Sequence, residues 1–486
     1  MQKSFFNTQT EMIYKGVLRY LGKSIFIQLS VVFTFTGYAQ TRTASDEDAV
    51  FIKRIYNQAL TTSSGYDWLH QLSVGIGGRL AGSPQAAAAV EFAFQELSAM
   101  GLDSVWLQPC IVPHWVRGEK EVVTIVNSSR IGTQPLSALA LGNSPGTGRN
   151  GIVGEVIEVQ SLEELDKKSI EDIKGKIVFF NRPFDNTQIQ TFHAYGKAVD
   201  QRGNGPSKAS VKGAIAAIVR SMTGRLDDVP HTGVTIFEEG VAPIPAVAIS
   251  TLDADLLSSL LKEERTKVYI KTSCEKLTDK KSFNVIGEIK GIEKPEQILL
   301  VGGHLDSWDV GGGAHDDGAG CAHSIEVLRL LKAMNYRPKH TIRCVLFMNE
   351  ENGLAGAKAY AEISNLKNEQ HLFALESDAG GFSPIGFSCD ADESVFVPFF
   401  QKINTWLPLL EPYNLHLSKG GSGADISLLK SQNGLLCGLR PDSHKYFDYH
   451  HSERDTIEAV HPRELALGSA AMAALIYLVD RYGLDN

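Results

Sequence analysis

The chain has 486 residues, of which 43% are hydrophobic and 21% are charged, and its formal net charge is −9. This length exceeds what one hydrophobic core ordinarily organises, so we expect two domains. The mildly acidic charge, without a basic cluster that contains interleaved aromatic residues, argues against a nucleic-acid partner.

The first 39 residues have the pattern of an export signal. Basic residues up to Lys23 precede an apolar run from Ile25 to Phe35, and the small residues Gly37 and Ala39 fit signal-peptidase cleavage after Ala39. The alternative is a membrane anchor, but the run is short for a membrane span and contains polar residues. We therefore predict a secreted or periplasmic protein with no stable membrane insertion after signal cleavage.

Six cysteines follow the signal, and their pairing is open. They are Cys110, Cys274, Cys321, Cys344, Cys389 and Cys437. The even number and the predicted export permit disulfides, but there is no CxxC or other tight spacing. Cys344 and Cys437 lie in apolar, strand-like runs, which favours buried free thiols.

The residue pattern in the middle of the chain differs from the pattern at its two ends. From about Gly118 to Cys274, short strand-like runs alternate with turn residues, and no cluster of metal ligands occurs. This pattern predicts an inserted β-rich domain. We predict a signal at residues 1–39, a catalytic domain in two parts at 40–117 and 281–486, and the insert at 118–280.

In the last part of the chain, possible metal ligands follow predicted strands. An unbroken apolar run at 298–301, typical of a buried parallel strand, leads to His304. A second strand at 341–348 leads to Glu350, and a third at 373–375 leads to Asp378. Helix-like segments lie between them, so the ligands are expected in the crevice where open α/β sheets bind ligands.

Each of these side chains could be a solvated turn residue on its own. His304 offers a neutral nitrogen to zinc, and Asp306 could accept its other ring proton and fix the tautomer. One carboxylate of the pair Asp316 and Asp317 could bridge two cations about 4 Å apart.

The pair Glu350 and Glu351 would repel unless a positive charge lies near, so one is expected to bind metal and the other to accept a proton. Together with His451, the set indicates metal-assisted hydrolysis. No HExxH motif is present, so a helix-borne protease zinc site is not indicated.

Longer motifs carry a resemblance to a known family. They are GGHLDSWDVGGGAHDDGAG, NEENGLAGA, ESDAGGF, GSGADIS and KYFDYHHSERDT. They resemble the di-zinc exopeptidases of the zinc aminopeptidase and glutamate carboxypeptidase type, over nearly all of the mature chain. The resemblance implies an α/β fold with a mixed, mostly parallel sheet flanked by helices, and an inserted β-rich domain similar to a protease-associated domain. It also implies two Zn²⁺ per chain and a homodimer.

The resemblance assigns roles to the site residues. His304 and Asp378 would bind one zinc, and Glu351 and His451 the other. Asp316 would bridge the two ions and be joined to Asp317 by a cis peptide bond. Glu350 would be the general base and later the general acid. For His450, a part in stabilising the oxyanion and a packing role beside the ligand both remain open.

The expected function is an exported exopeptidase that hydrolyses dipeptides or short peptides with zinc-activated water. Alternatives are an aminopeptidase acting on longer peptides, a glutaminyl cyclase with one zinc, and an inactive receptor-like homologue. The direction of cleavage is open, because a free α-carboxylate needs a basic partner such as Lys445 or Arg440 and a free α-amine needs an acidic one.

Overall fold

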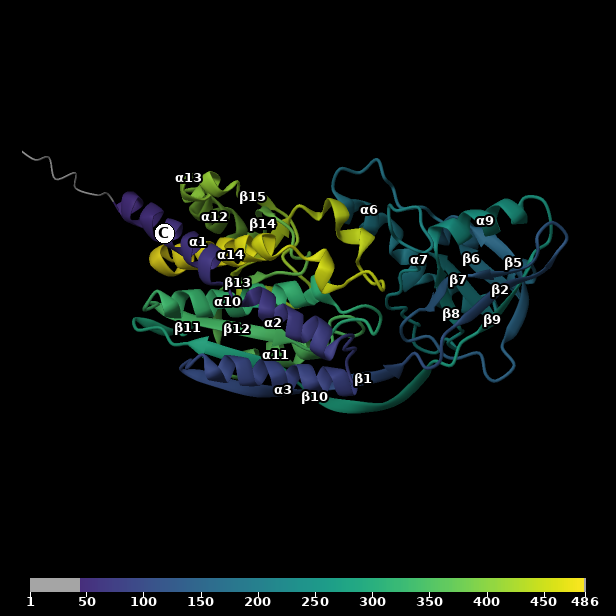
Figure 1. The fold of residues 1–486 in the computed structure, drawn as a ribbon, viewed down its shortest axis with the longest axis horizontal. Helices are drawn as coiled ribbons and strands as arrows, with labels where there is room; N and C mark the ends of the chain where they lie inside the picture. The colour runs from purple at the N-terminus through teal and green to yellow at the C-terminus, as the bar shows by residue number, and fades with distance from the viewer. Residues whose placement is uncertain (1–43, 485–486) are drawn as a thin grey trace, which may run out of the picture. The chain divides into compact units, whose positions relative to one another are not determined.

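The computed structural model describes residues 44–484. The predicted export signal and its cleavage site lie outside these residues. Within them the chain forms two mixed β-sheets with helices against them (Figure 1). The predicted α/β class, with a mixed sheet flanked by helices, is confirmed.

The first sheet has eight strands. In spatial order they are β1 (Ser104–Val116), β10 (Glu275–Ile289), β12 (His340–Phe347), β11 (Lys294–His304), β13 (Gln370–Glu376), β16 (Leu435–Pro441), β14 (Pro384–Asp390) and β15 (His416–Lys419). The central strands β12, β11, β13 and β16 run parallel, whereas β1, β10 and β14 pair antiparallel with their neighbours toward the centre.

Helices cover both faces of this sheet. They are α1 (Ala44–Thr62), α2 (Gly65–His70), α3 (Pro84–Ala99), α10 (Ala319–Ala333), α11 (Ala355–Leu366), α12 (Glu393–Asn404), α13 (Leu407–Leu410) and α14 (Pro462–Tyr482). Successive residues of a strand point to opposite faces. On β11, Leu299 and Val301 join a core with α10 and α14, while Ile298 and Leu300 join a second core with α11. Burial on both faces explains the unbroken apolar run in the sequence.

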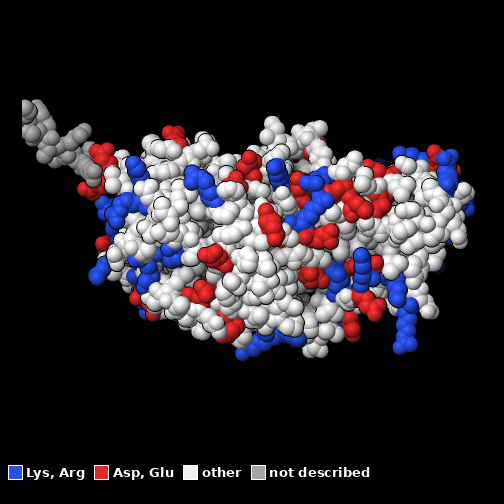
Figure 2. All heavy atoms as spheres, viewed as in Figure 1, with Lys and Arg blue, Asp and Glu red and all other residues white. Residues whose placement is uncertain are grey.

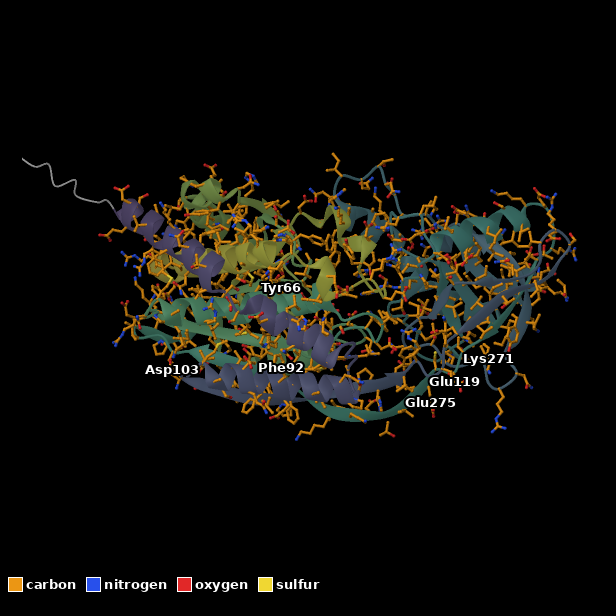
Figure 3. All side chains as sticks on the ribbon, in the orientation of Figure 1. Tyr66, Phe92, Asp103, Glu119, Lys271 and Glu275 are labelled. Carbon is orange, nitrogen blue, oxygen red and sulfur yellow. The ribbon has the colours of Figure 1, made fainter. Side chains whose placement is uncertain are left out.

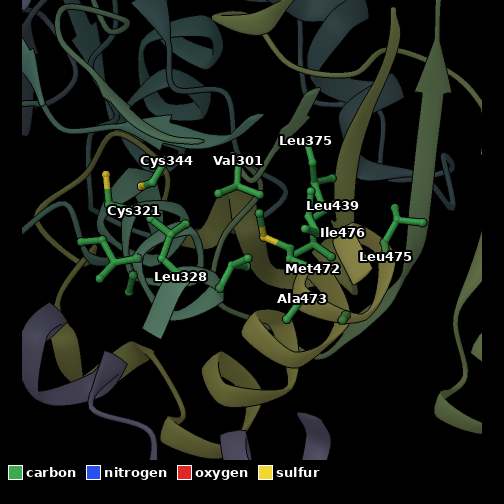
Figure 4. Close-up of a cluster of buried hydrophobic side chains, with 14 of the residues drawn as sticks. Val301, Cys321, Leu328, Cys344, Leu375, Leu439, Met472, Ala473, Leu475 and Ile476 are labelled. Atoms are coloured by element: carbon green, nitrogen blue, oxygen red, sulfur yellow. The ribbon is translucent and has the colours of Figure 1, made fainter. Parts of the chain in front are cut away.

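Helix α14 forms the centre of the larger core. Met472, Ala473, Leu475 and Ile476 pack with side chains of the sheet and of α10 (Figure 4). Of the described helices, α14 is the one whose length and hydropathy match a membrane span, but 83% of its apolar window is buried inside the protein. It is therefore a core helix.

The second sheet lies within residues 122–271 and also has eight strands. In spatial order they are β3 (Gly132–Leu136), β2 (Val122–Ser128), β9 (Lys267–Lys271), β5 (Ile152–Val159), β6 (Ile177–Phe180), β7 (Ala216–Arg220), β8 (Ala246–Ile249) and β4 (Ala138–Ala140). Alternation again separates two cores, with Ile177 and Phe179 in one and Val178 and Phe180 in the other.

This region contains more helix than its strand-like sequence suggested. Its helices are α4 (Leu162–Lys167), α5 (Ile170–Ile173), α6 (Thr191–Ala198), α7 (Asp200–Gly203), α8 (Gly205–Val211) and α9 (Thr251–Leu261). Several are capped by a serine; on α9, for example, Ser250 accepts a hydrogen bond from the backbone N–H of Asp253. The short lengths of α4 to α8 explain why no helical periodicity was evident.

The long strands β1 and β10 connect the two sheets. They pair antiparallel from Ser104 opposite Glu288 to Val116 opposite Glu275. Glu119 and Glu275, labelled in Figure 3, lie where the chain leaves and re-enters the first sheet. Sequence reasoning did not predict either strand at this length, because polar residues occupy much of the β10 segment before Ser282.

The cysteines are unpaired, and charges of both signs lie on the surface. All six cysteines are free and buried, so the expectation of buried free thiols is confirmed. On the face drawn in Figure 2, basic and acidic side chains are interspersed.

Candidate metal centre

The predicted ligands meet at one edge of the first sheet. His304 is the last residue of β11, Glu351 follows β12, and Asp378 follows β13. Because β11 pairs parallel with both β12 and β13, the carboxyl ends of these strands lie at the same edge. This edge is where open α/β sheets bind their ligands.

A tight turn at Ala314–Gly318, just before α10, supplies the next carboxylate. The peptide bond between Asp316 and Asp317 is cis, as the resemblance implied. The Asp317 carboxylate faces the backbone, because it accepts hydrogen bonds from the N–H groups of His304 and Gly320, each at 3.0 Å. Asp316 points the other way, and its two oxygens each lie 3.2 Å from a histidine Nε2, one on His304 and one on His451.

The other two predicted ligands extend this chain of contacts at both ends. Asp378 Oδ1 lies 3.6 Å from His304 Nε2, and Glu351 Oε2 lies 3.1 Å from His451 Nε2. All five predicted ligands are therefore brought together in the order Asp378, His304, Asp316, His451 and Glu351. The Asp316 carboxylate lies between the two histidines.

These residues fit a bound cation. Nε2 of His304 and Oδ2 of Asp316 are buried and have no hydrogen-bond partner among the described residues. Zinc binds nitrogen and carboxylate oxygen at roughly 2.0–2.2 Å, so neighbouring atoms of a tetrahedral site lie about 3.3–3.6 Å apart. The separations of 3.1–3.6 Å between the ligand atoms lie within about 0.2 Å of this range. The nitrogen and oxygen donors suit zinc.

Asp306 makes a different contact from the one predicted. Nδ1 of His304 donates to the backbone carbonyl of Asp306 at 3.0 Å, whereas the nearest carboxylate oxygen is 3.9 Å away. That oxygen instead accepts the backbone N–H groups of Asn349 at 2.6 Å and Glu350 at 3.1 Å. Asp306 thus fixes the His304 tautomer through its backbone and holds the Glu350 loop through its carboxylate.

Residues of the 118–280 segment contact His451, which sequence reasoning did not foresee. Nδ1 of His451 lies 3.3 Å from the Thr232 carbonyl and 3.3 Å from Nη1 of Arg202. Arg202 also donates to the Thr232 carbonyl and to the hydroxyl of Tyr195. No local motif marks these residues, since they reach the site only through the fold.

His450 lies beside the ligand. Its ring stacks on that of His451 with centroids 3.5 Å apart, and its Nε2 is 3.8 Å from Asp316 Oδ2. The backbone carbonyl of His450 accepts a hydrogen bond from Nδ1 of His231. Burial and the neighbouring His451 lower the pKa of His450 well below its usual range, which keeps the imidazole neutral.

Asp455 supports the turn that carries Asp316. Its carboxylate accepts the backbone N–H groups of His315 at 2.7 Å and of Asp316 at 3.1 Å. Burial raises the pKa of Asp455 to about 7. The sequence contained a clue to this residue, because Asp455 follows His451 within the motif HHSERDT.

Glu350 lines two cavities next to the predicted ligands. It lines a 210 Å³ cavity with Asp316, Glu351 and Asp378, and also a 640 Å³ cavity with Trp115. Burial, together with the carboxylates of Asp378 and Glu351, raises the pKa of Glu350 well above its usual range. A raised pKa is what a general base at neutral pH requires.

Known proteins share this architecture. Residues 284–476 match the model of peptidase family M28. Carboxypeptidase Q from Bos taurus is 36% identical over 427 residues, which cover 87% of this chain and 86% of that protein.

Two solved structures are similar to this chain. A peptidase M28 precursor from Shewanella amazonensis SB2B is 33% identical with a TM-score of 0.84, covering 90% of this chain and 97% of that one. A zinc aminopeptidase from Bacillus subtilis shares the fold, at 21% identity and a TM-score of 0.62, covering 86% of this chain and 96% of that one. The chain is therefore an enzyme of peptidase family M28 with the zinc exopeptidase fold.

Proposed function

We propose that this enzyme is an exported, zinc-dependent exopeptidase that hydrolyses dipeptides or short peptides. The observation that carries the proposal is the position of the Asp316 carboxylate, with one oxygen on His304 and the other on His451. The Asp316 carboxylate lies between two histidines, and each histidine also lies close to a second carboxylate. This arrangement suits two cations that share one ligand. The names of the carboxypeptidase and aminopeptidase relatives support exopeptidase activity.

His304 and Asp378 would hold one zinc, His451 and Glu351 the second, and Asp316 both. Two zinc ions would supply Lewis acidity, which acidifies water and polarises the peptide carbonyl. The backbone carbonyls of Asp306 and Thr232 leave Nε2 of His304 and His451 free to bind metal, because each carbonyl accepts a hydrogen bond from the Nδ1–H of its histidine.

As the water attacks the peptide carbonyl, Glu350 takes a proton from that water. Glu350 then passes this proton to the leaving amine. Its place at the wall of two cavities gives its carboxylate access to substrate. Asp306 acts as a positioning residue, since its carboxylate holds the Glu350 backbone. The neutral imidazole of His450 is available to stabilise the oxyanion if its Nε2 carries the proton; packing against His451 is the other role.

The domain division, the oligomer and the export are part of the proposal. Residues 118–280 would form an insert similar to a protease-associated domain, which shapes the cleft through Tyr195 and Arg202. The enzyme would be a homodimer in the periplasm or outside the cell. Light scattering that finds a monomer at micromolar concentration would contradict the homodimer. An exported protein that still begins at residue 1 would contradict cleavage of the signal.

Dipeptides with modified ends test this function. We expect cleavage of unblocked dipeptides and little attack on N-acetylated or C-amidated forms, because a buried group that binds a charged terminus is left unpaired when the charge is lost. Efficient cleavage inside a long, doubly blocked peptide would contradict exopeptidase action. Cleavage of amino-acid amides but not of N-blocked peptides would favour an aminopeptidase, and cyclisation of N-terminal glutamine with one zinc would favour the cyclase.

A further inference from the structure

A cavity of 530 Å³ lies beside the metal centre, and its charge is one-sided. Ala379, the residue after the ligand Asp378, forms part of its wall. The wall also contains His193, His416, Lys419 and Arg440, and no Asp or Glu among residues 44–484 lines it. Its volume falls within the range of small-molecule sites, about 300–1,000 Å³. A cavity with cationic walls suits an anionic group.

Arg440 is the best-defined cation of this wall. It lies on β16, where Nε donates to the Ser388 hydroxyl at 2.6 Å and Nη2 donates to the Gly421 carbonyl at 2.5 Å. The guanidinium is therefore held in one orientation by neutral acceptors.

No carboxylate among the described residues pairs with Arg440. Burial lowers the pKa of Arg440, and the carboxylates of Asp378 and Glu376, neither of which forms an ion pair with it, oppose this effect together with the thiols of Cys389 and Cys437. Arginine nevertheless keeps its charge at neutral pH. A partly buried cation with only neutral acceptors is incompletely compensated, and a carboxylate is the ligand that a guanidinium binds with the best geometry.

We propose that Arg440 is a specificity-determining residue that binds a carboxylate of the peptide substrate in this cavity. The inference rests on the proposed function and names the substrate class, which is peptides with a carboxylate within one residue of the scissile bond. This carboxylate is either the free α-carboxylate of the leaving residue or an acidic side chain. Lys445, the other basic residue considered from the sequence, is exposed and does not line the cavity.

Arg440→Met and Arg440→Lys test the proposal in the zinc-loaded enzyme. We expect Arg440→Met to lower kcat/KM about 10- to 100-fold for carboxylate-bearing substrates, mainly through KM, and to leave substrates without that carboxylate unchanged. Arg440→Lys should recover part of the loss, because it keeps the charge without the paired donors. Lys430→Met is the matched control, since Lys430 pairs with Asp390 at 2.9 Å and does not line the cavity.

Two substrate pairs distinguish the source of the carboxylate. If Arg440 binds the α-carboxylate, the variant loses the preference for a free dipeptide over its C-amide. If Arg440 binds an acidic side chain, the variant loses the preference for glutamate over glutamine next to the scissile bond. An equal fall for every substrate, or no change in either preference, would overturn the proposal.

Binding gives a readout that does not depend on turnover. Titration calorimetry with glycyl-glutamate in the Glu350→Gln background, which retains zinc but hydrolyses slowly, should show weaker binding when Arg440→Met is added, with zinc content and melting temperature unchanged. Equal affinities would overturn the role of Arg440 even if the enzyme cleaves dipeptides. A zinc-loaded wild type that binds the dipeptide through Arg440 but never cleaves a peptide would leave this inference standing and remove the proposed function.

Discussion

Nη1 of Arg202 lies 3.3 Å from Nδ1 of His451, and both groups face the carbonyl oxygen of Thr232. The carbonyl can only accept, so it accepts a hydrogen bond from the Nδ1–H of His451 as well as one from Arg202. This arrangement fixes the tautomer in which Nε2 is free for a metal. A residue far from every catalytic motif thereby contributes to the order of the metal centre.

Arg202→Ala tests this contribution. We expect kcat/KM to fall about 10- to 100-fold, because the groups that orient a metal ligand typically matter to this extent. Zinc content and dipeptide kinetics are the measurements. Arg182→Ala is the control, since Arg182 holds the same helical segment through the Lys197 carbonyl and Asp200 without contacting a ligand. Equal losses in both variants would mean that Arg202 only stabilises the fold.

Glu350→Gln separates proton transfer from metal binding. The amide keeps the shape of the side chain but cannot accept the proton, so turnover should fall about 10²- to 10⁴-fold with zinc retained. Glu351→Gln should instead lower the zinc content, because Glu351 contacts His451 directly. Activity within a few-fold of the wild type in Glu350→Gln would show that another group is the base.

Buried neutral histidines should make the protein sensitive to acid. Burial lowers the pKa of His371 to about 4, while Tyr360 and Gln432 occupy its two ring nitrogens. The unfolded chain binds this proton near its ordinary pKa of about 6.5, whereas the folded protein does not until about 4. The free energy of unfolding should therefore fall as pH drops from about 6.5 to about 4, by roughly 3 kcal/mol for this residue.

Urea denaturation at a series of pH values checks this expectation. His371→Gln removes the titrating group and should flatten the dependence over this range. His444→Gln serves as a control, because His444 is exposed. An unchanged slope in His371→Gln would mean that His371 does not titrate as the structure requires.

The sequence predicted which residues the fold would bring together more readily than it predicted the strands and helices around them. His304, Glu350 and Asp378 were found because apolar parallel strands lead directly to them, so local pattern and site coincide. Choosing Asp316 over Asp317 needed family resemblance, because only the turn geometry shows which carboxylate faces the histidines.

Long-range contacts account for what the sequence did not reveal. Arg202 and Thr232 reach His451 across more than 200 positions, and no periodicity or spacing carries that information. The β10 strand was missed over its first half because it is exposed and lysine-rich, so its partner β1 rather than an apolar pattern determines its extent. The 530 Å³ cavity likewise arises only when β14, β15 and β16 come together.

The most direct test of the central claim is a zinc titration of the metal-free enzyme, with bound zinc and dipeptide hydrolysis measured on the same samples. The positions of Asp378, His304, Asp316, His451 and Glu351 predict that zinc binding saturates at close to two ions per chain and that full activity requires both. Asp316→Asn should lower the affinity for both zinc ions, because the Asp316 carboxylate faces both histidines. Saturation at one zinc per chain with full activity would contradict the di-zinc account.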